Sequence, residues 1–175
     1  MRPVLLALCV ASMVGTASAQ DPARERLTRE AAGQAAEADK LFKQGRFEEA
    51  LNLYRAERKS RRELGDVRYE AYACRGIACC LARLGDWEET VEAARDAKKI
   101  DLSGEDKGLA GYDALLVARG LIRLGDDDAA EKELAFAVGR FTGGEDRDHE
   151  GEARVLLGGL RLHAGKRADS AKEFD

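Results

Sequence analysis

Apolar residues recur along the chain with the spacing of amphipathic helices, and such runs end at a glycine. Ile77, Ala78, Leu81 and Leu84 share one face of a helix that stops before Gly85. Glycine ends a helix well because it reaches the left-handed conformation at little steric cost. The pattern predicts a helix, a tight glycine turn and a second helix.

This helix–turn–helix unit recurs with a constant period of 40 residues. Four columns keep their register over four copies, which indicates an array of repeats. Small residues in two of the columns allow paired helices to cross closely. The columns are Gly45, Gly85, Gly125 and Gly165; Ala38, Ala78, Ala118 and Gly158; Ala50, Thr90, Ala130 and Ser170; and Tyr54, Ala94, Leu134 and Phe174.

Further glycine-containing breaks at 64–66, 103–105 and 142–144 separate one repeat from the next. Asp86 and Asp126 directly follow turn glycines and are suited to cap the next helix. The chain has only two prolines, both before residue 23, and only three isoleucines and four threonines. This composition excludes an all-β sandwich, a collagen-like rod and a proline-rich linker.

The segments GRFEEALNLY (Gly45–Tyr54) and ACRGIACCLARLGDWEETVEAA (Ala73–Ala94) resemble the tetratricopeptide repeat (TPR) family, and the resemblance covers about residues 31–174. It implies an all-α, right-handed α-solenoid of about four repeats. The period is similar to the longer repeats of kinesin light chains and polarity scaffolds, whereas the commonest TPR has about 34 residues. HEAT and armadillo repeats are alternatives that lack this glycine-to-small-residue spacing. Sel1-like repeats, which have their own glycine-rich turn signature, are a further alternative.

The chain departs from the TPR pattern in three respects. The proline that usually ends the second helix is missing from every repeat. Asp127 stands where the first two repeats have an aromatic residue, and Arg161 occupies a column that otherwise holds leucine. The fourth repeat is therefore the least regular.

Residues 1–19 have the features of a cleaved secretory signal peptide, with a basic start, an apolar run and a small-x-small site before Gln20. A membrane anchor is an alternative, but the apolar run is short for a bilayer core of about 30 Å. A lipoprotein signal is another, although Cys9 lies too early for it. We expect an exported chain with a lead-in at 20–30 and the repeat domain at 31–175.

Charge and cysteine content limit the partners. The formal net charge is −4, which opposes nucleic-acid binding because that requires a basic surface. An exported chain would retain Cys74, Cys79 and Cys80, an odd number without metal-site spacing. We expect small buried thiols, with an intermolecular or redox role as the alternative.

Two segments superficially resemble ligand loops. Gly159–Lys166 has five residues between its glycines, and Arg167 replaces the Ser/Thr of a phosphate loop. Asp146–Gly151 has the start of a calcium loop, but its twelfth position is Leu157, so a solvated acidic linker is expected. No catalytic motif occurs, and we expect no enzyme activity, cofactor or metal.

The resemblance implies that five positions of the first helix of each repeat face a concave groove. In the second and third repeats these ten positions hold four arginines and two tyrosines but no acid, which favours an acidic peptide or a free C-terminal carboxylate. The alternative is that the arginines pair with acids on neighbouring helices. The positions are Tyr72, Arg75, Cys79, Ala82 and Arg83 in the second repeat, and Tyr112, Leu115, Arg119, Ile122 and Arg123 in the third.

These observations favour a non-catalytic scaffold of the periplasm or secreted space that binds protein or peptide in this groove, with no membrane span. The alternative function is a structural or oligomerising module that makes its contacts through exposed repeat edges. Solenoids usually end in a polar capping helix, and none follows the fourth repeat. We therefore expect a frayed last helix, or a homo-oligomer or partner that covers Leu157, Leu160 and Phe174.

Overall fold

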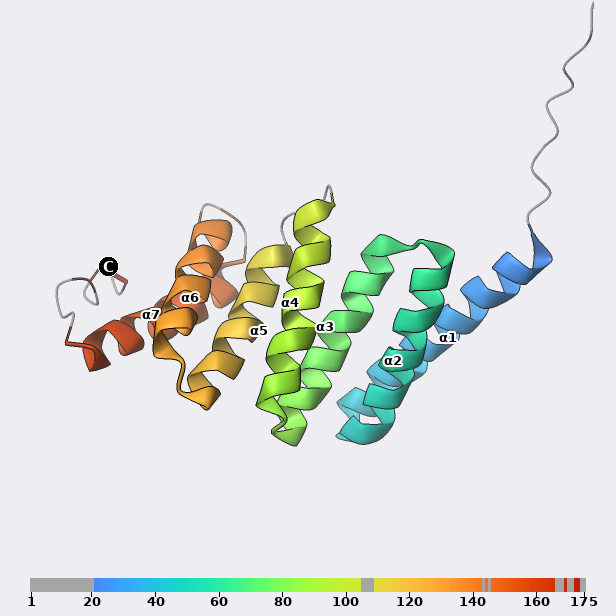
Figure 1. The fold of residues 1–175 in the computed structure, drawn as a ribbon, viewed down its shortest axis with the longest axis horizontal. Coiled ribbons are helices and arrows are strands. Elements are labelled where there is room, and N and C mark those ends of the chain that lie inside the picture. Colours follow the sequence, from blue (N-terminus) through green and yellow to red (C-terminus); the bar gives the residue numbers. More distant parts are fainter. Residues whose placement is uncertain are drawn as a thin grey trace, which may run out of the picture.

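The computed structural model describes residues 21–104, 109–142, 144, 146–165, 169 and 172–173. Over these residues the chain forms seven α-helices and no strand (Figure 1). The expected signal peptide lies outside them, as do Ser170 and Phe174 of the fourth repeat. The helices are α1 (Pro22–Lys43), α2 (Phe47–Leu64), α3 (Val67–Leu84), α4 (Trp87–Ser103), α5 (Leu109–Leu124), α6 (Asp127–Phe141) and α7 (Arg147–His163).

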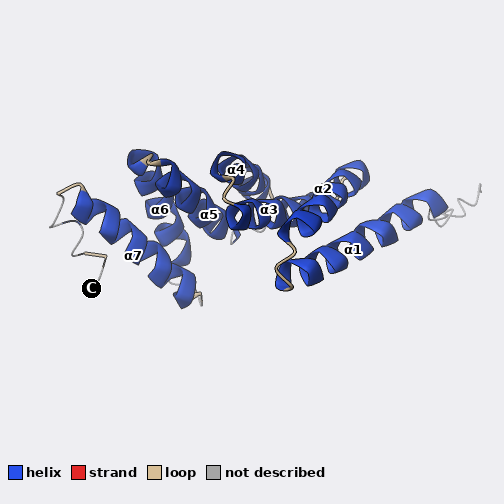
Figure 2. Ribbon diagram, turned by 90° about the horizontal axis from the view of Figure 1, so that it is seen from below, coloured by secondary structure: helices blue, strands red, loops and turns tan. Residues whose placement is uncertain are grey.

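Each helix packs against the next one along the chain, which makes the molecule a solenoid. In Figure 2, α2 and α4 lie above α1 and α3, and α6 is seen between α5 and α7. We call α1, α3, α5 and α7, the first helices of the repeats, the inner helices, and α2, α4 and α6, the second helices, the outer helices. The predicted all-α solenoid is confirmed.

The glycine turns form as the sequence predicts. Five glycines have φ between 69° and 89°, a region that strains other residues. The break after α4 is different, because Gly104 has φ of −88° and an extended backbone that any residue can adopt. The five left-handed glycines are Gly45, Gly65, Gly85, Gly125 and Gly165.

The small-residue columns lie in the core, as expected for close helix crossings. Ala38, Ala78 and Ala118 are fully buried, and so are Ala50 and Ala130. The fourth repeat column, nine residues after each turn glycine, is also buried, at Tyr54, Ala94 and Leu134. The side chains of α1 to α6 thereby form one continuous core along the array.

The first helix is longer than the repeat requires. It begins at Pro22, after Asp21 accepts a hydrogen bond from the backbone of Ala23 at 3.0 Å, and it continues past residue 31 without a break. Arg24 donates to the carbonyl of Leu64 at 2.8 Å, which joins the extra turns to the end of α2. The expected lead-in is therefore helical from residue 22.

The acidic segment at Asp146–Gly151 is not a loop. Asp146 accepts a hydrogen bond from the backbone of His149 at 3.3 Å and begins α7, which is helical from Arg147. A helical backbone cannot wrap alternate oxygens around a calcium ion. Gly159 also lies inside α7, so it does not begin a phosphate loop.

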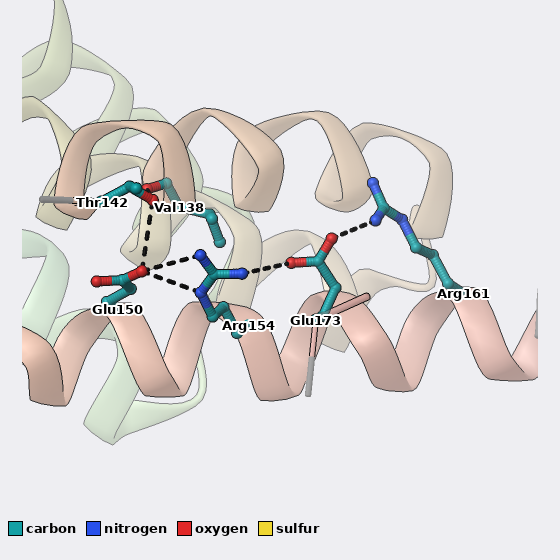
Figure 3. Close-up of polar contacts among 6 residues, drawn as sticks. All are labelled: Val138, Thr142, Glu150, Arg154, Arg161 and Glu173. Carbon is teal, nitrogen blue, oxygen red and sulfur yellow. Dashed lines mark hydrogen bonds and ion pairs between the residues drawn. The ribbon is translucent and has the colours of Figure 1, made fainter. Parts of the chain in front are cut away.

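Arg161 stands at the position where the other repeats have a leucine, and it forms ion pairs there. Its Nε donates to Glu131 on α6 at 3.0 Å, and Arg161 and Arg154 both pair with Glu173 (Figure 3). The last part of the described chain is thus held on α7 by charge. We expected Leu157 to lie at the exposed C-terminal edge. It is only 1% exposed and packs in the core, so a partner cannot contact it there.

Candidate ligand-binding groove

A recurring contact joins neighbouring inner helices along the concave face. In each case the two residues lie 33 positions apart, so the contact repeats with the solenoid. The Tyr72 hydroxyl donates to Asp39 at 2.7 Å, the Cys79 sulfur lies 4.0 Å from the Tyr112 hydroxyl, and Arg119 Nε donates to Glu152 at 2.8 Å. The same groove position therefore holds an acid, a thiol and a guanidinium in successive repeats.

A pocket of about 380 Å³ opens between α3, α5 and α7, beside the start of α4. The sequence-predicted groove residues that line it are Ala82, Arg83, Arg119, Ile122 and Arg123. Trp87, Leu116 and Leu156 add apolar wall. We call this site the arginine pocket.

Two of its arginines rest on aromatic rings and keep their charge unpaired. The Arg123 guanidinium lies 5.0 Å from the ring centre of Trp87, and that of Arg83 lies 6.0 Å from Phe47. Neither forms an ion pair with another residue of the described chain. Cation–π contacts hold such groups in place while their N–H donors stay free. Arg119 is different, because it pairs with Glu152, and both side chains remain more than a third exposed.

The prediction for Arg75 and Leu115 is wrong. Arg75 donates to Asp101 at 2.5 Å and to Asp113 at 2.7 Å, and its side chain is only 12% exposed. Asp113 is fully buried, and burial raises the pKa of its carboxyl group. Leu115 has no exposed surface. The expected alternative, pairing with acids of neighbouring helices, holds for Arg75 and also for Arg119.

Tyr112 and the three cysteines of α3 are partly or fully covered by neighbouring side chains. Tyr112 packs edge-on against His149, with ring centres 5.0 Å apart, and burial raises its pKa to about 12. Cys74, Cys79 and Cys80 are all free thiols, and the first and last are buried. Burial raises the pKa of each thiol, which disfavours the reactive thiolate.

A second pocket, of about 550 Å³, lies between α1 and α3. Its walls include Asp39, Tyr69 and Tyr72, and three alanines of α1 form an apolar floor. Asp39 accepts hydrogen bonds from the hydroxyls of both Tyr54 and Tyr72. We call this site the Asp39 pocket. The groove positions predicted from the sequence lie only in the second and third repeats and do not include it. Ala32 and Asp39 precede Tyr72 and Cys79 by one 40-residue period, so the same register predicts that they face the groove.

No protein-family model matches the sequence, and no curated protein matches it either. Solved structures do match the fold. BtubC (BKLC) from P. vanneervenii superposes with a TM-score of 0.74 at 16% identity, over 86% of this chain and 66% of BtubC. The Yersinia enterocolitica type III secretion translocator chaperone SycD gives 0.66 at 14% identity, over 80% of this chain and 95% of SycD. A kinesin light chain structure from P. anserina with nearly identical TPR-like repeats gives a TM-score of 0.66 at 15% identity, over 91% of this chain and 75% of the kinesin light chain structure.

The fold is a TPR-like solenoid. These identities are too low to carry over residue roles, so the chemistry of the groove rests on this chain's own side chains. Within the described ranges no helix is long and apolar enough to cross a membrane. The same residues contain no cluster of three or more His, Cys, Asp or Glu side chains placed to hold a metal ion.

Some cations of the outer helices of the TPR-like solenoid pair with acids of the next outer helix. Arg55 on α2 pairs with Glu89 on α4 at 2.9 Å. Lys98 on α4 pairs with Glu133 on α6 at 2.5 Å, with both side chains mostly buried. Others, such as Arg95 and Lys132, are exposed and form no ion pair within the described chain. What distinguishes Arg83 and Arg123 is that each lies over an aromatic ring and lines a pocket.

Proposed function

We propose that the chain is a non-catalytic scaffold that binds an extended protein segment in the concave groove, with the arginine pocket as its anchor. The observation that carries the proposal is the pair Arg83 and Arg123, whose guanidinium groups are exposed, positioned on aromatic rings and unpaired within the described chain. The pocket lies at the groove positions that the TPR-like repeat pattern indicates. Binding of protein segments is a common use of such solenoids.

The chemistry of the pocket favours a segment that combines acidic and apolar groups. Guanidinium groups bind carboxylates through two parallel hydrogen bonds, and an apolar wall accommodates a hydrophobic side chain. A free C-terminal carboxylate would supply the same anion. SycD, one of the solved structures with this fold, is a type III secretion translocator chaperone, which supports a protein-binding use of the fold.

A double charge reversal tests the proposal. Short random peptides displayed on phage would be selected on the purified protein, and an enriched peptide would be measured by fluorescence anisotropy. Arg83→Glu with Arg123→Glu should weaken its binding at least about 50-fold, because two attractive contacts become repulsive. The matched control is Arg95→Glu with Lys132→Glu, which reverses two exposed charges on the outer helices α4 and α6. Equal loss in both double variants would contradict a specific groove.

The second candidate function is an oligomerising module, and one observation favours it. Val155 and Leu162 on α7, at 58% and 55%, are the two most exposed large apolar side chains of the described chain. A second copy could cover them at the C-terminal edge. Analytical ultracentrifugation of the wild type and of Val155→Lys with Leu162→Lys decides the matter. A dimer that the double variant abolishes would support this function, and a wild-type monomer over the whole concentration range would exclude it.

We also propose that the protein acts outside the cytoplasm, in the periplasm or secreted space. The support is the apolar N-terminal run and the small-x-small site before Gln20. An exported scaffold would meet its partners in an oxidising compartment, where its two buried cysteines are protected from disulfide exchange by their lack of access.

A further inference from the structure

We propose that the groove is polarised and that it binds a segment carrying a basic side chain in the Asp39 pocket and an acidic group in the arginine pocket. This inference rests on the proposed function, since it names the partner that the same groove would take. It adds a second anchor, of opposite charge, in the pocket between α1 and α3.

The Asp39 carboxylate is held in a fixed position and can accept a cation. Two tyrosine hydroxyls donate to it, from Tyr54 at 2.5 Å and from Tyr72 at 2.7 Å, so its position is fixed from two helices. No Lys, Arg or His of the described chain forms an ion pair with it. Arg61, a cation among the residues that line this pocket, pairs with Glu57 and with Asp66 at 3.0 Å.

The surroundings of Asp39 suit a long basic side chain. Tyr72 is 38% exposed at the pocket wall, and aromatic faces attract cations. The neighbouring Tyr69 ring already lies under the Arg61 guanidinium, 4.3 Å from the ring centre. The alanine floor of α1 accepts the methylene stem of lysine or arginine, which covers apolar surface while its charged end reaches a carboxylate. A volume of about 550 Å³ leaves room for such a side chain.

The two pockets belong to one groove because the repeat places them in register. Asp39, Cys79 and Arg119 occupy equivalent positions of α1, α3 and α5, and Arg119 is paired with Glu152. The unpaired Asp39 lies in the pocket between α1 and α3, and the unpaired Arg83 and Arg123 lie in the pocket between α3, α5 and α7. A segment with both charges at the matching separation satisfies both pockets, whereas a segment with one sign of charge is repelled at one of them.

Peptide selection on matched variants tests this polarity. The phage-displayed random peptides would be selected separately on the wild type, on Asp39→Asn and on Glu88→Gln. Asparagine keeps the size of the side chain and can still accept the tyrosine hydrogen bonds, and a thermal melt would verify that the fold is retained. Glu88→Gln is the control because it removes an exposed carboxylate from the outer helix α4.

We expect the wild type and Glu88→Gln to enrich peptides with a basic and an acidic residue at a constant separation. Asp39→Asn should lose the basic preference, keep the acidic one, and bind a wild-type-selected peptide about tenfold more weakly. Enrichment of acidic peptides alone by both the wild type and Asp39→Asn would overturn the polarity and leave the arginine pocket as the binding site. No enrichment on the wild type would contradict both the polarity and the proposed function.

Discussion

Arg75 and Arg83 are the same residue type on the same inner helix, yet the structure gives them opposite roles. Arg75 is buried between the carboxylates of Asp101 and Asp113. Arg83 is exposed at the arginine pocket and lies over an aromatic ring. One arginine therefore contributes to stability, and the other is free to bind a ligand.

Removing Arg75 should destabilise the fold. Arg75→Ala leaves two buried carboxylates without their cation, and loss of one partner of a buried ion pair typically costs about 3–5 kcal/mol. Urea unfolding should show a loss of this order, whereas Arg83→Ala should change the free energy of unfolding by less than about 0.5 kcal/mol. Similar small effects of both substitutions would mean that Arg75 is not a structural residue.

Glu57 should make stability depend on pH. It is fully buried on α2, and burial raises its pKa to about 7, against the pairing effect of Arg61. The folded state thus favours the protonated acid, so its contribution is complete below about pH 4 and is lost as the pH rises through about 7. We expect the free energy of unfolding to fall by an amount on the order of 2 kcal/mol between pH 5 and pH 8.

The matched variants isolate this contribution. Glu57→Gln should flatten the pH profile of urea unfolding, while Glu48→Gln, at an exposed position of the same helix, should leave it unchanged. Part of the slope should remain in Glu57→Gln, because burial also raises the pKa of Asp113. A wild-type stability that rises with pH over this range would contradict the assignment.

At the residue scale, five of the residues that line the arginine pocket were expected in the groove, but the state of each side chain was not. Arg83 and Arg123 were expected there from the repeat register together with the groove positions that the TPR resemblance implies. Pairing of an arginine with acids of neighbouring helices was an expected alternative. Which arginine pairs, and with which acid, could not be predicted, because Asp101 lies on an outer helix and Asp113 was not among the groove positions. Register shows which face a residue is on, whereas pairing depends on contacts between helices.

At the scale of helices, glycine permits close packing inside the array as well as at the turns. A Cβ atom added to Gly120 of α5 would lie 2.5 Å from a methyl carbon of Val91 on α4. Nothing lies within 4 Å of a Cβ atom added to Gly33 of α1. The two positions are both inside helices, so they have the same intrinsic preference for alanine.

This contrast gives a prediction with an internal control. Gly120→Ala should destabilise the fold by about 1–3 kcal/mol, because α4 and α5 must move apart. Gly33→Ala should stabilise it by about 0.5–1 kcal/mol through helix propensity. Differential scanning calorimetry of the two variants would measure both changes, and a melting temperature raised by both would contradict the packing.

The helices themselves were largely predictable from the sequence, since the 40-residue period fixes the turns at Gly45, Gly85, Gly125 and Gly165 and both small-residue columns. The start of α1 at Pro22 was not, because its first turns precede the repeat and rest on the Arg24 contact with α2. The first turn of α7 was missed for a different reason. Asp146 was considered as a metal ligand, although aspartate is equally suited to cap a helix.

At the scale of the whole molecule, export and groove binding are separate proposals that can be tested separately. Expression of the full chain in a bacterial host should yield a periplasmic form that begins at Gln20, because the small-x-small site ends at Ala19. Intact mass spectrometry of the periplasmic fraction would show the cleavage. Replacing Ala17 and Ala19 with bulky residues should block it. A full-length cytoplasmic product from the wild-type chain would contradict export.

The central claim is that a ligand binds the concave side of the solenoid through the arginine pocket. The most direct measurement is an NMR titration of the isotope-labelled protein with a selected peptide, observed at backbone amides and arginine side-chain Nε groups. We expect the largest shifts at Arg83 and Arg123, and at amides of α3, α5 and α7 that border the pocket, with α2 and α6 unchanged. Shifts that gather on the outer helices while both arginine signals stay in place would contradict the account.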